Sequence, residues 1–600
     1  MQLPRNTLVL LVVDLALVLL AGWAAFWLRF NFDIPDEFDN LALRAAPWGL
    51  IGYGAGLMLA RVYRHVWSYI GLPELRQLAT GIMLGGLLTA ASILMQRMPS
   101  FPRSVLLLQP LIALVLLGAV RAGWRTFVER RTLGQGGRRL VIVGSLQDAS
   151  DALRALKGSL QWLPVGIVSP LAGEVGRSIQ NVRVLGRTAE ISLIAEAAEA
   201  DAALVASPAG SSERRSALMS AAGSHLTLLT MPRPDEWLKT EGAGPRKIEL
   251  EDLLGRTPVQ LDAAGLAELL SGQTVLVTGA GGSIGSELCR QVARFGIGRL
   301  VCVDVSEYAV YQLEQEMRTA HPEMHGFYYT ANVREVERLR AIALKHRPAV
   351  VFHAAAYKHV PLMEELNEIE ALRTNVAGTL NAARVAGECG ARRFVMISTD
   401  KAVNPTNVMG SSKRLAELMV QGVAAEYAGT QYVSVRFGNV LGSSGSVVPL
   451  FTAQIARGGP VTVTHPEIVR YFMTIPEAAQ LVLQAGLMGS SGQIFVLDMG
   501  EPMKIVELAR MLIRLSGKTE QEIPISYTGL RPGEKLFEEL LADDETTEPT
   551  PHPKLRVAKT SGQVPDIEAV MRWIEDAGPA PAHDELRRWL RGQVPEYTPR

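Results

Sequence analysis

Cysteine and net charge are both scarce in this 600-residue chain. Lys and Arg together number 60, as do Asp and Glu, and this balance argues against a general nucleic-acid-binding protein, which would carry a basic excess. The three cysteines, Cys289, Cys302 and Cys389, do not have the spacing of metal ligands. We therefore predict reduced, mostly buried thiols, no metal site and no nucleic-acid partner.

A glycine-rich loop is missing from the first of two regions that alternate strands and helices. Residues 138–245 open with the apolar run Arg139–Gly144, but the loop that follows reads S-L-Q-D-A-S. Without glycines the backbone cannot closely approach a phosphate. Further strands are predicted at 163–168, 202–205 and 226–229. We expect a degenerate Rossmann-like domain whose role is structural or regulatory rather than catalytic.

Long apolar stretches are confined to the N-terminus. They cover about 7–28, 45–62, 78–96 and 104–121, and each approaches the roughly 20 residues that cross a bilayer. The first is too long for a signal-peptide core and lacks a convincing cleavage site, so it should be retained. We predict a transmembrane anchor of about four helices over residues 1–125. The second stretch contains several glycines and a proline, so it could also be re-entrant or irregular.

The charges beside these stretches predict their orientation. The loop after the first stretch is acidic, whereas arginines follow the second and fourth stretches, and Arg97 and Arg103 are the exceptions. By the positive-inside rule, both chain ends and the domains that follow should be cytoplasmic. Asp14 lies inside the first stretch, where a charge is costly, so it should either meet a packing partner or serve a function.

The rest of the chain is organised around residues 273–304. The apolar run Val275–Val277 predicts a strand, and Gly279, Gly282 and Gly285 follow it at G-x-x-G-x-x-G spacing, with Ser283 and Ile284 between the last two. A helix is predicted from Ser286 to Phe295, and a second strand leads to Asp304. Glycines let the backbone approach a pyrophosphate at a helix N-terminus, and an acid about 20 residues on holds a ribose. The pattern predicts NAD, rather than NADP, because no Arg directly follows Asp304.

Strand–helix alternation continues to about residue 545, which predicts a doubly wound parallel sheet over 273–545. Polar or small residues follow several of its strands, where ligands bind. Further cofactor contacts are predicted at Asn332, Val333, Ala354, Ala355, Ala356 and Asn375. Residues 246–272 should form a linker or arm that packs on this domain or on a neighbouring subunit. The C-terminal tail, 546–600, should serve packing or oligomer contact.

A hydroxyl, an acid and an amine stand side by side after the apolar strand Arg393–Ile397. Thr399, Asp400 and Lys401 are therefore candidates for acid–base chemistry. In the next predicted helix Met409 and Lys413 are four residues apart, so they share one helical face.

The combination T-G-A-G-G-S-I-G, H-A-A-A-Y-K-H-V-P, S-T-D-K and M-G-S-S-K resembles the extended short-chain dehydrogenase/reductases. With apolar stretches and a second Rossmann-like region in front, the chain is similar to the membrane-bound UDP-N-acetylglucosamine 4,6-dehydratases, the CapD-like polysaccharide-biosynthesis family. The resemblance implies a homo-oligomer in the bacterial inner membrane that acts on a UDP-sugar. Substrate contacts are then expected at Lys358, His359, Asn439, Arg470, Arg531 and Glu534.

The resemblance also implies roles for the candidate acid–base residues. Asp400 would protonate the departing 6-hydroxyl, and Lys401 would remove the proton from carbon 5, which requires its pKa to fall through burial or through Lys413. Thr399 would bind the carbon-4 oxygen, and Lys413 the nicotinamide ribose.

One residue of the superfamily pattern is missing. The pattern is Tyr-x-x-x-Lys, and Met409 stands at the Tyr position, where a thioether cannot transfer a proton. We therefore expect a nucleotide-sugar 4,6-dehydratase. The alternatives are a UDP-sugar epimerase of the same fold, which would rely on the missing Tyr, and a membrane scaffold that only senses a nucleotide.

Overall fold

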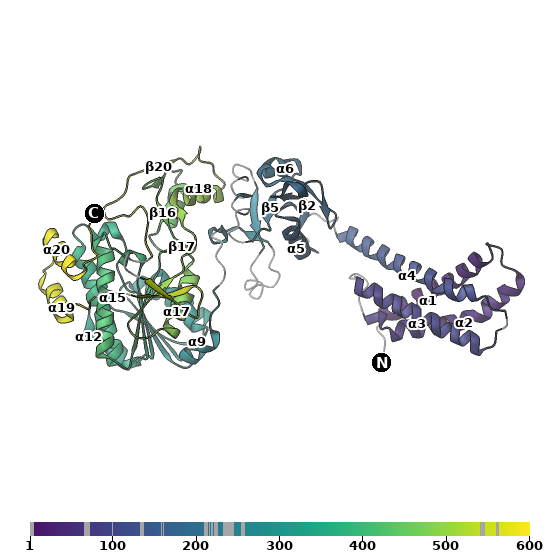
Figure 1. Cartoon of the computed structure of the whole chain (residues 1–600), viewed down its shortest axis with the longest axis horizontal. Coiled ribbons are helices and arrows are strands. Elements are labelled where there is room, and N and C mark those ends of the chain that lie inside the picture. Colours follow the sequence, from purple (N-terminus) through teal and green to yellow (C-terminus); the bar gives the residue numbers. More distant parts are fainter. Residues whose placement is uncertain are drawn as a thin grey trace. The chain divides into compact units, whose positions relative to one another are not determined.

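The computed structural model describes residues 5–64, 72–98, 100–132, 137–157, 159, 161–208, 214, 216–217, 220, 226–231, 245–253, 259–540, 546–559 and 563–599 (Figure 1). The chain forms two compact units, Met1–Arg138 with Leu156–Leu163, and Arg139–Ala155 with Pro164–Arg600. Residues 254–258 of the expected linker, and most of those between the third and fourth strands expected in 138–245, lie outside the described residues.

The N-terminal unit contains four long helices. They are α1 (Arg5–Arg29), α2 (Asp36–Leu59), α3 (Leu72–Met95) and α4 (Arg103–Thr132). Three of them, α1, α3 and α4, are long and apolar enough to cross a membrane, whereas α2 is not among them. Four membrane-spanning helices were expected, and three of the described helices have the length and hydropathy of a membrane span. The second apolar stretch is a continuous helix through Pro47 and not an irregular element.

Glycine explains both features of α2. Glycine lowers the mean hydropathy of a helix, yet it lets two helix backbones approach closely. Gly52 and Gly56 on α2 face Gly81 and Gly85 on α3, and both pairs have G-x-x-x-G spacing. A Cβ atom at Gly56 would overlap the backbone of Gly81 and Gly85, so no larger residue fits without separating the helices.

Asp14 has packing partners. Its carboxylate accepts hydrogen bonds from Arg121 Nη1 at 3.0 Å, from Arg121 Nη2 at 2.6 Å and from Tyr63 Oη at 2.9 Å. Asp14 and Arg121 are both buried. Arg121 thus neutralises the charge in α1 and is not a free charge flanking the fourth stretch.

A seven-stranded sheet forms the region that was expected to be a degenerate Rossmann-like domain. Its order is β3-β4-β2-β1-β5-β6-β7, and the pairs β2–β4, β1–β5 and β5–β6 are parallel. Its strands are β1 (Arg138–Val143), β2 (Trp162–Ser169), β3 (Ser178–Ile179), β4 (Val182–Arg187), β5 (Ala202–Val205), β6 (Thr227–Thr230) and β7 (Arg246–Lys247), with helices α5 (Leu146–Leu156) and α6 (Ile191–Ala197).

The N-terminus of α5 is occupied by the protein's own carboxylates. Leu146 N donates to Glu174 Oε2 at 3.0 Å, Ser169 Oγ donates to the same oxygen at 2.6 Å, and Ser145 N donates to Asp148 at 3.3 Å. A dinucleotide fold would bind phosphate at this position. The negative charge of Glu174 fills that role here.

A nine-stranded sheet forms the larger domain, in the order β10-β9-β8-β11-β12-β13-β18-β22-β21. The seven strands from β10 to β18 are parallel, which is the 3-2-1-4-5-6 order of dinucleotide-binding folds with one further strand. The strands are β8 (Thr274–Thr278), β9 (Arg299–Asp304), β10 (His325–Thr330), β11 (Val350–His353), β12 (Arg393–Ile397), β13 (Gln431–Arg436), β18 (Gln493–Leu497), β21 (Thr546–Pro549) and β22 (Leu555–Lys559).

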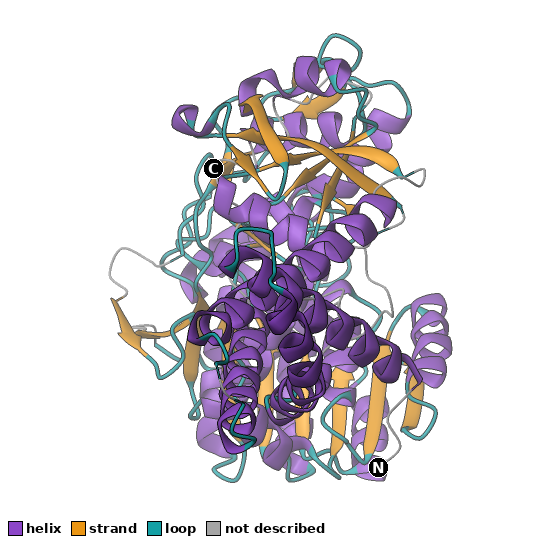
Figure 2. Ribbon diagram, turned by 90° about the vertical axis from the view of Figure 1, so that its right-hand side faces the viewer, coloured by secondary structure: helices purple, strands orange, loops and turns teal. Residues whose placement is uncertain are grey.

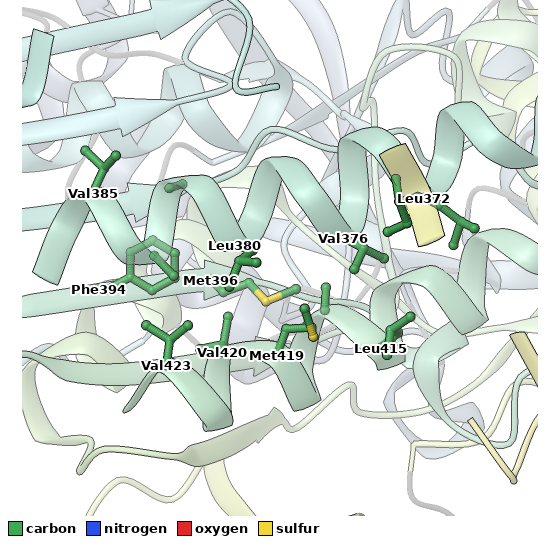
Figure 3. Close-up of a cluster of buried hydrophobic side chains, with 14 of the residues drawn as sticks. Leu372, Val376, Leu380, Val385, Phe394, Met396, Leu415, Met419, Val420 and Val423 are labelled. Atoms are coloured by element: carbon green, nitrogen blue, oxygen red, sulfur yellow. The ribbon is translucent and has the colours of Figure 1, made fainter. Parts of the chain in front are cut away.

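Hydrophobic clusters lie on both faces of this sheet. Figure 2 shows strands in orange and helices in purple. Leu276 belongs to one cluster, whereas Val275 and Val277 belong to the other, as strand alternation requires. Figure 3 shows part of the first cluster, in which Phe394 and Met396 meet Leu380 and Met419. The helices of the first face are α12 (Val336–His346), α14 (Gly378–Glu388), α15 (Val408–Glu426), α19 (Ile567–Asp576) and α20 (His583–Gln593); those of the second are α9 (Ala263–Leu270), α10 (Ser283–Ala293), α11 (Glu307–Ala320) and α17 (Ile475–Met488).

Smaller elements follow β13 and cover the carboxyl edge of the sheet. Three two-stranded pairs, β14–β17, β15–β20 and β16–β19, come from this part of the chain. They are β14 (Asn439–Val440), β15 (Val461–Val463), β16 (Val469–Arg470), β17 (Phe472–Met473), β19 (Met503–Lys504) and β20 (Ile525–Tyr527), with α16 (Val447–Ala456) and α18 (Ile505–Leu515).

We expect Asp14→Leu to destabilise the N-terminal unit, because it leaves the Arg121 guanidinium buried without its carboxylate. Removing one partner of a buried ion pair typically costs about 3–5 kcal/mol. Denaturant unfolding of the purified protein in detergent measures this loss. The double variant Asp14→Leu/Arg121→Leu should recover most of it, and a double variant as unstable as the single one would contradict the interpretation.

Candidate active site

The glycine loop joins β8 to α10 at the switch point of the sheet, where β8 neighbours both β9 and β11. Gly279 has φ +68°, and a Cβ atom there would lie 2.5 Å from Ala355 N. A Cβ at Gly285 would overlap Gly279 O. Both positions therefore require glycine. Helix α10 begins at Ser283, three residues before the expected start. Gly282 is therefore its N-cap, and Ser283 and Ile284 are its first two residues.

The loop keeps the features that a dinucleotide needs. Gly282 caps α10 without a side-chain hydrogen bond, and a Cβ there would meet only Gly279 O, at 3.3 Å. Its outer side is therefore open to a ligand. Asp304 ends β9 beside the loop, where its carboxylate accepts hydrogen bonds from Gly281 N and Ser306 N, both at 2.9 Å. These residues fit a bound pyrophosphate and ribose.

The loop after β11 is shaped by a buried amide. Asn375 lies in the π-helical segment η7 (Leu372–Ala377), is fully buried, and accepts a hydrogen bond from Tyr357 N at 2.8 Å. Its Nδ2 atom donates to Tyr357 O at 3.0 Å and to Ser412 Oγ at 2.9 Å. All of its polar atoms are engaged, so Asn375 holds the segment after Ala354–Ala356 in place. The expectation that it contacts the cofactor itself remains a prediction.

Two of the residues expected to contact the cofactor, Asn332 and Val333, follow β10. Asn332 accepts a hydrogen bond from Arg334 N at 3.0 Å, and Val333 is buried and packs on Gly378. Both residues lie at the carboxyl edge of the sheet, as the glycine loop does.

The three candidate acid–base residues lie together after β12. Asp400 is 1% exposed and accepts hydrogen bonds at Oδ1 from Thr399 Oγ1, at 2.9 Å, and from Lys401 Nζ, at 3.0 Å. Its other oxygen, Oδ2, is buried and has no hydrogen-bond partner among the described residues. A buried acceptor without a partner is costly, so this oxygen is suited to a substrate hydroxyl.

The structure corrects the expected electrostatics of the two lysines. Burial lowers the pKa of Lys401, but the carboxylates of Asp400 and Glu538 outweigh it and hold that pKa above its ordinary value. Burial lowers the pKa of Lys413 instead, to about 8, although Glu417 opposes the shift. The expectation that burial or Lys413 lowers the pKa of Lys401 is therefore wrong for this state, because two acids face Lys401.

Met409 and Lys413 occupy the first turns of α15. Met409 is 2% exposed and belongs to the hydrophobic core, whereas Lys413 Nζ donates to Ile397 O at 2.6 Å, at the end of β12. A Cβ atom at Gly410 would overlap Lys401 O, so α15 packs directly on the acid–base segment. Lys413 therefore lies at the same strand end as Thr399 and Asp400.

An alternating series of charges leads from this segment to the expected nucleotide contacts. Lys401 Nζ lies 3.7 Å from Glu538 Oε1, which lies 3.6 Å from Arg470 Nε. Arg470 Nη2 lies 3.5 Å from Glu534 Oε1, which also accepts a hydrogen bond from Arg531 Nη2 at 3.1 Å. Arg470 is buried, whereas the Arg531 side chain is 56% exposed and accessible to a ligand.

The remaining expected substrate contacts come from two loops. Lys358 and His359 follow β11 and are exposed, and a Cβ atom at Gly445 would lie 2.5 Å from His359 Cε1. Asn439 begins β14 and donates to Tyr471 O at 3.4 Å. His359 thus packs on the loop that follows β14.

Two buried carboxylates of the site escaped the sequence analysis. Glu538 lies four residues after Glu534 in the sequence. Its neighbour Glu539 is an acid in the same sequence context but is exposed, so the sequence does not show which of the two is buried. Glu417 is fully buried and accepts hydrogen bonds from Ser398 Oγ at 2.6 Å and from Arg436 Nε and Nη2, both at 2.8 Å. Its spacing from Lys413 is a weak signal, since acids four residues from a lysine usually lie on exposed helix faces.

Comparison with known proteins extends over almost the whole chain. A family described as "Polysaccharide biosynthesis protein" matches residues 275–560. The chain is 39% identical to "Capsular polysaccharide biosynthesis protein CapD" of Staphylococcus aureus, covering 90% of this chain and 91% of that protein. It is 38% identical to "Probable polysaccharide biosynthesis protein EpsC" of Bacillus subtilis, covering 96% of each. It is 33% identical to a "UDP-glucose 4-epimerase" of Rickettsia rickettsii, covering 46% of this chain and 79% of that protein.

We expect Gly282→Val to lose bound NAD while the domain stays folded. The added side chain meets only Gly279 O inside the protein and otherwise occupies the open side of the loop. NAD content after purification and the circular dichroism spectrum measure the two effects. Gly429→Val is the matched control, because a Cβ there meets nothing within 4 Å and the residue lies far from the loop in sequence. Equal NAD content in the two variants would show that this loop does not bind the pyrophosphate.

Proposed function

Because this chain belongs to the CapD-like family of polysaccharide-biosynthesis proteins, we propose that it is an NAD-dependent nucleotide-sugar 4,6-dehydratase. Its substrate is UDP-N-acetylglucosamine or a close UDP-N-acetylhexosamine, and its product is the UDP-4-keto-6-deoxy sugar used for surface polysaccharide. The observation that carries the proposal is the Asp400–Lys401 ion pair, in which the buried carboxylate keeps one oxygen without a partner among the described residues. A Met occupies the usual Tyr position.

The proposed reaction removes water from carbons 5 and 6 of the sugar. When bound, NAD⁺ would supply the redox chemistry, namely a hydride acceptor for carbon 4 and a hydride donor for carbon 6. Gly279, Gly282 and Gly285 hold its pyrophosphate and Asp304 its ribose, and the segment Ala354–Ala356 lies beside that loop. The cofactor is regenerated in each cycle, so it should remain bound.

Asp400 and Lys401 divide the proton transfers between them. Asp400 Oδ2 accepts the proton of the 4-hydroxyl as the ketone forms. The ketone acidifies the proton on carbon 5, which neutral Lys401 removes. Asp400 then returns its proton to the departing 6-hydroxyl, which leaves as water. Lys401 finally delivers a proton to carbon 5, so both residues end as they began. Thr399, which donates to Asp400 in the free enzyme, binds the carbon-4 oxygen.

Lys401 must lose one proton before this cycle starts. Since two carboxylates hold its pKa above the ordinary value, turnover should rise with pH through that pKa. Lys413, whose pKa is lowered to about 8, adds positive field at the end of β12 and binds the nicotinamide ribose.

An epimerase is the second candidate, because the catalytic half is 33% identical to a protein named as one. Met409 argues against it, since a thioether cannot take the proton that the Tyr hydroxyl would exchange. Incubation of the purified protein with UDP-N-acetylglucosamine separates the two, with mass spectrometry and NMR as readouts. Loss of one water supports the dehydratase and isomerisation without loss supports the epimerase. Binding without turnover would leave only a nucleotide-sensing scaffold.

We also propose that α1, α3 and α4 anchor the protein in the bacterial inner membrane, that the catalytic domain is cytoplasmic, and that the protein assembles as a homo-oligomer. The length and composition of these helices support the first statement. Arginines after the second and fourth apolar stretches support the second. Protease protection in membrane vesicles tests the orientation.

We expect Asp400→Asn and Lys401→Met each to reduce turnover by about 10²–10⁴-fold with smaller effects on substrate affinity, because positioned acid–base groups act on moving protons. Exchange of the carbon-5 proton with deuterated water distinguishes the two. It should vanish in Lys401→Met. It should vanish in Asp400→Asn as well, because the ketone cannot form without an acceptor for the 4-hydroxyl proton. Exchange that persists in Asp400→Asn would restrict Asp400 to protonating the 6-hydroxyl.

We expect Met409→Tyr to give no strong gain in activity. Met409 lies in the core at 2% exposure, so a larger polar residue there brings a packing cost and no required proton. A large rise in turnover for this variant would show that the site depends on a hydroxyl that it lacks.

A further inference from the structure

Glu538 is a buried carboxylate that touches the candidate base but stands outside the proposed proton transfers. Its side chain is 5% exposed, and its Oε1 atom lies 3.7 Å from Lys401 Nζ and 3.6 Å from Arg470 Nε. Lys401 thus lies between two acids, Asp400 on its own segment and Glu538 on the C-terminal turn. A buried carboxylate is costly unless it is paired, so Lys401 and Arg470 explain how the carboxylate of Glu538 can be buried.

Hydrogen bonds hold the turn that carries Glu538 against two other segments, one that contains Arg470 and one that follows Lys401. Arg470 Nη2 donates to Lys535 O at 2.7 Å, and its Nη1 atom donates to Leu536 O at 3.2 Å. Lys535 Nζ donates to Val403 O at 3.2 Å, two residues after Lys401. These hydrogen bonds from side chains to backbone carbonyls anchor the turn that carries Glu538 next to the segment that carries Lys401.

We propose that Glu538 is a positioning residue of this site, whose carboxylate holds Lys401 in place and sets the pH at which Lys401 becomes a base. This inference rests on the proposed function. Asp400 gains and loses a proton during the proposed cycle, so its attraction for Lys401 changes from step to step. Glu538 takes no part in those transfers and remains a constant counter-charge.

Among the residues that the structure describes, three charged groups shift the pKa of Lys401. Asp400 and Glu538 raise its pKa, and Arg470 lowers it, against a background of burial that also lowers it. Replacing Glu538 by Gln removes one raising charge and leaves Arg470 facing Lys401. The pKa of Lys401 must then fall, and the neutral, basic form appears at lower pH. Because turnover requires that form, the rising limb of the pH profile moves to lower pH.

The experiment compares full-length wild type with Glu538→Gln, Glu538→Asp and Glu539→Gln. Glu539 is the matched control, since its side chain is 45% exposed and binds Asn404 Nδ2, at 2.8 Å, and Lys535, at 3.5 Å. With UDP-N-acetylglucosamine at saturation, the rising limb of turnover should move down by about 1–2 pH units in Glu538→Gln, the shift that one adjacent charge produces. It should stay in place in Glu539→Gln. Glu538→Asp, which keeps the charge, should retain the wild-type limb even where its turnover is lower.

A second measurement follows Lys401 without turnover. The rate at which an amine-acylating reagent labels Lys401, measured by peptide mass spectrometry across pH, reports when this amine loses its proton. Labelling should begin at lower pH in Glu538→Gln than in wild type or Glu539→Gln. A purely structural role predicts lower turnover with no shift in either profile, and that result would overturn the proposal. So would equal shifts in the Gln and Asp variants. Failure of wild type to dehydrate the sugar would refute the proposed function, and the labelling comparison would still decide the role of Glu538.

Discussion

The site depends on one fully buried carboxylate, Glu417, that joins three chain segments. It binds Ser398 at the end of β12, Arg436 at the end of β13, and Arg414 on its own helix. Burial alone would raise its pKa, but these two arginines and the Ser398 hydroxyl hold it below the ordinary value. Its contribution to stability is therefore complete at neutral pH and is lost as the pH falls through the folded-state pKa. Thr399 and Asp400 directly follow Ser398, and Lys413 lies one helical turn before Glu417. The hydrogen bonds of Glu417 therefore help to hold these three candidate catalytic residues in place.

The same network reaches the end of the chain. Arg414 Nη2 lies 3.2 Å from Glu596 Oε1, and Arg587 on α20 binds Glu364, which accepts a hydrogen bond from Val408 N at 2.6 Å. Glu364 therefore caps the helix that carries Met409 and Lys413. The C-terminal tail, for which the sequence predicted packing or oligomer contact, packs on the helix that forms one wall of the site.

Local patterns predicted most of the catalytic sheet. Buried parallel strands are short apolar runs, and the strands expected at Val275–Val277 and Arg393–Ile397 agree with β8 and β12 to within about a residue. The electrostatics of Lys401 were missed because its partner Glu538 lies far along the chain, and nothing local separates that buried acid from exposed Glu539. Asn375 was predicted to contact the cofactor, but its pairing with the Tyr357 backbone depends on a π-helical segment that no periodicity reveals. Similarly, the glycines of α2 suggested irregular structure because glycine weakens helices in water, whereas a close helix partner turns it into a contact residue.

The two largest sheets of this chain, which are mostly parallel, differ in what binds the N-terminus of the helix that follows their first strand in the chain. In the larger domain, Gly282 caps α10 without a side-chain hydrogen bond, and the small residues around it leave space for a phosphate. In the smaller domain, the carboxylates of Glu174 and Asp148 accept hydrogen bonds from the backbone N–H groups of Leu146 and Ser145, respectively. A helix N-terminus attracts negative charge in both cases, but an internal acid supplies it in one and an external ligand can supply it in the other. The smaller sheet can therefore keep a nucleotide-binding topology without binding a phosphate at this position.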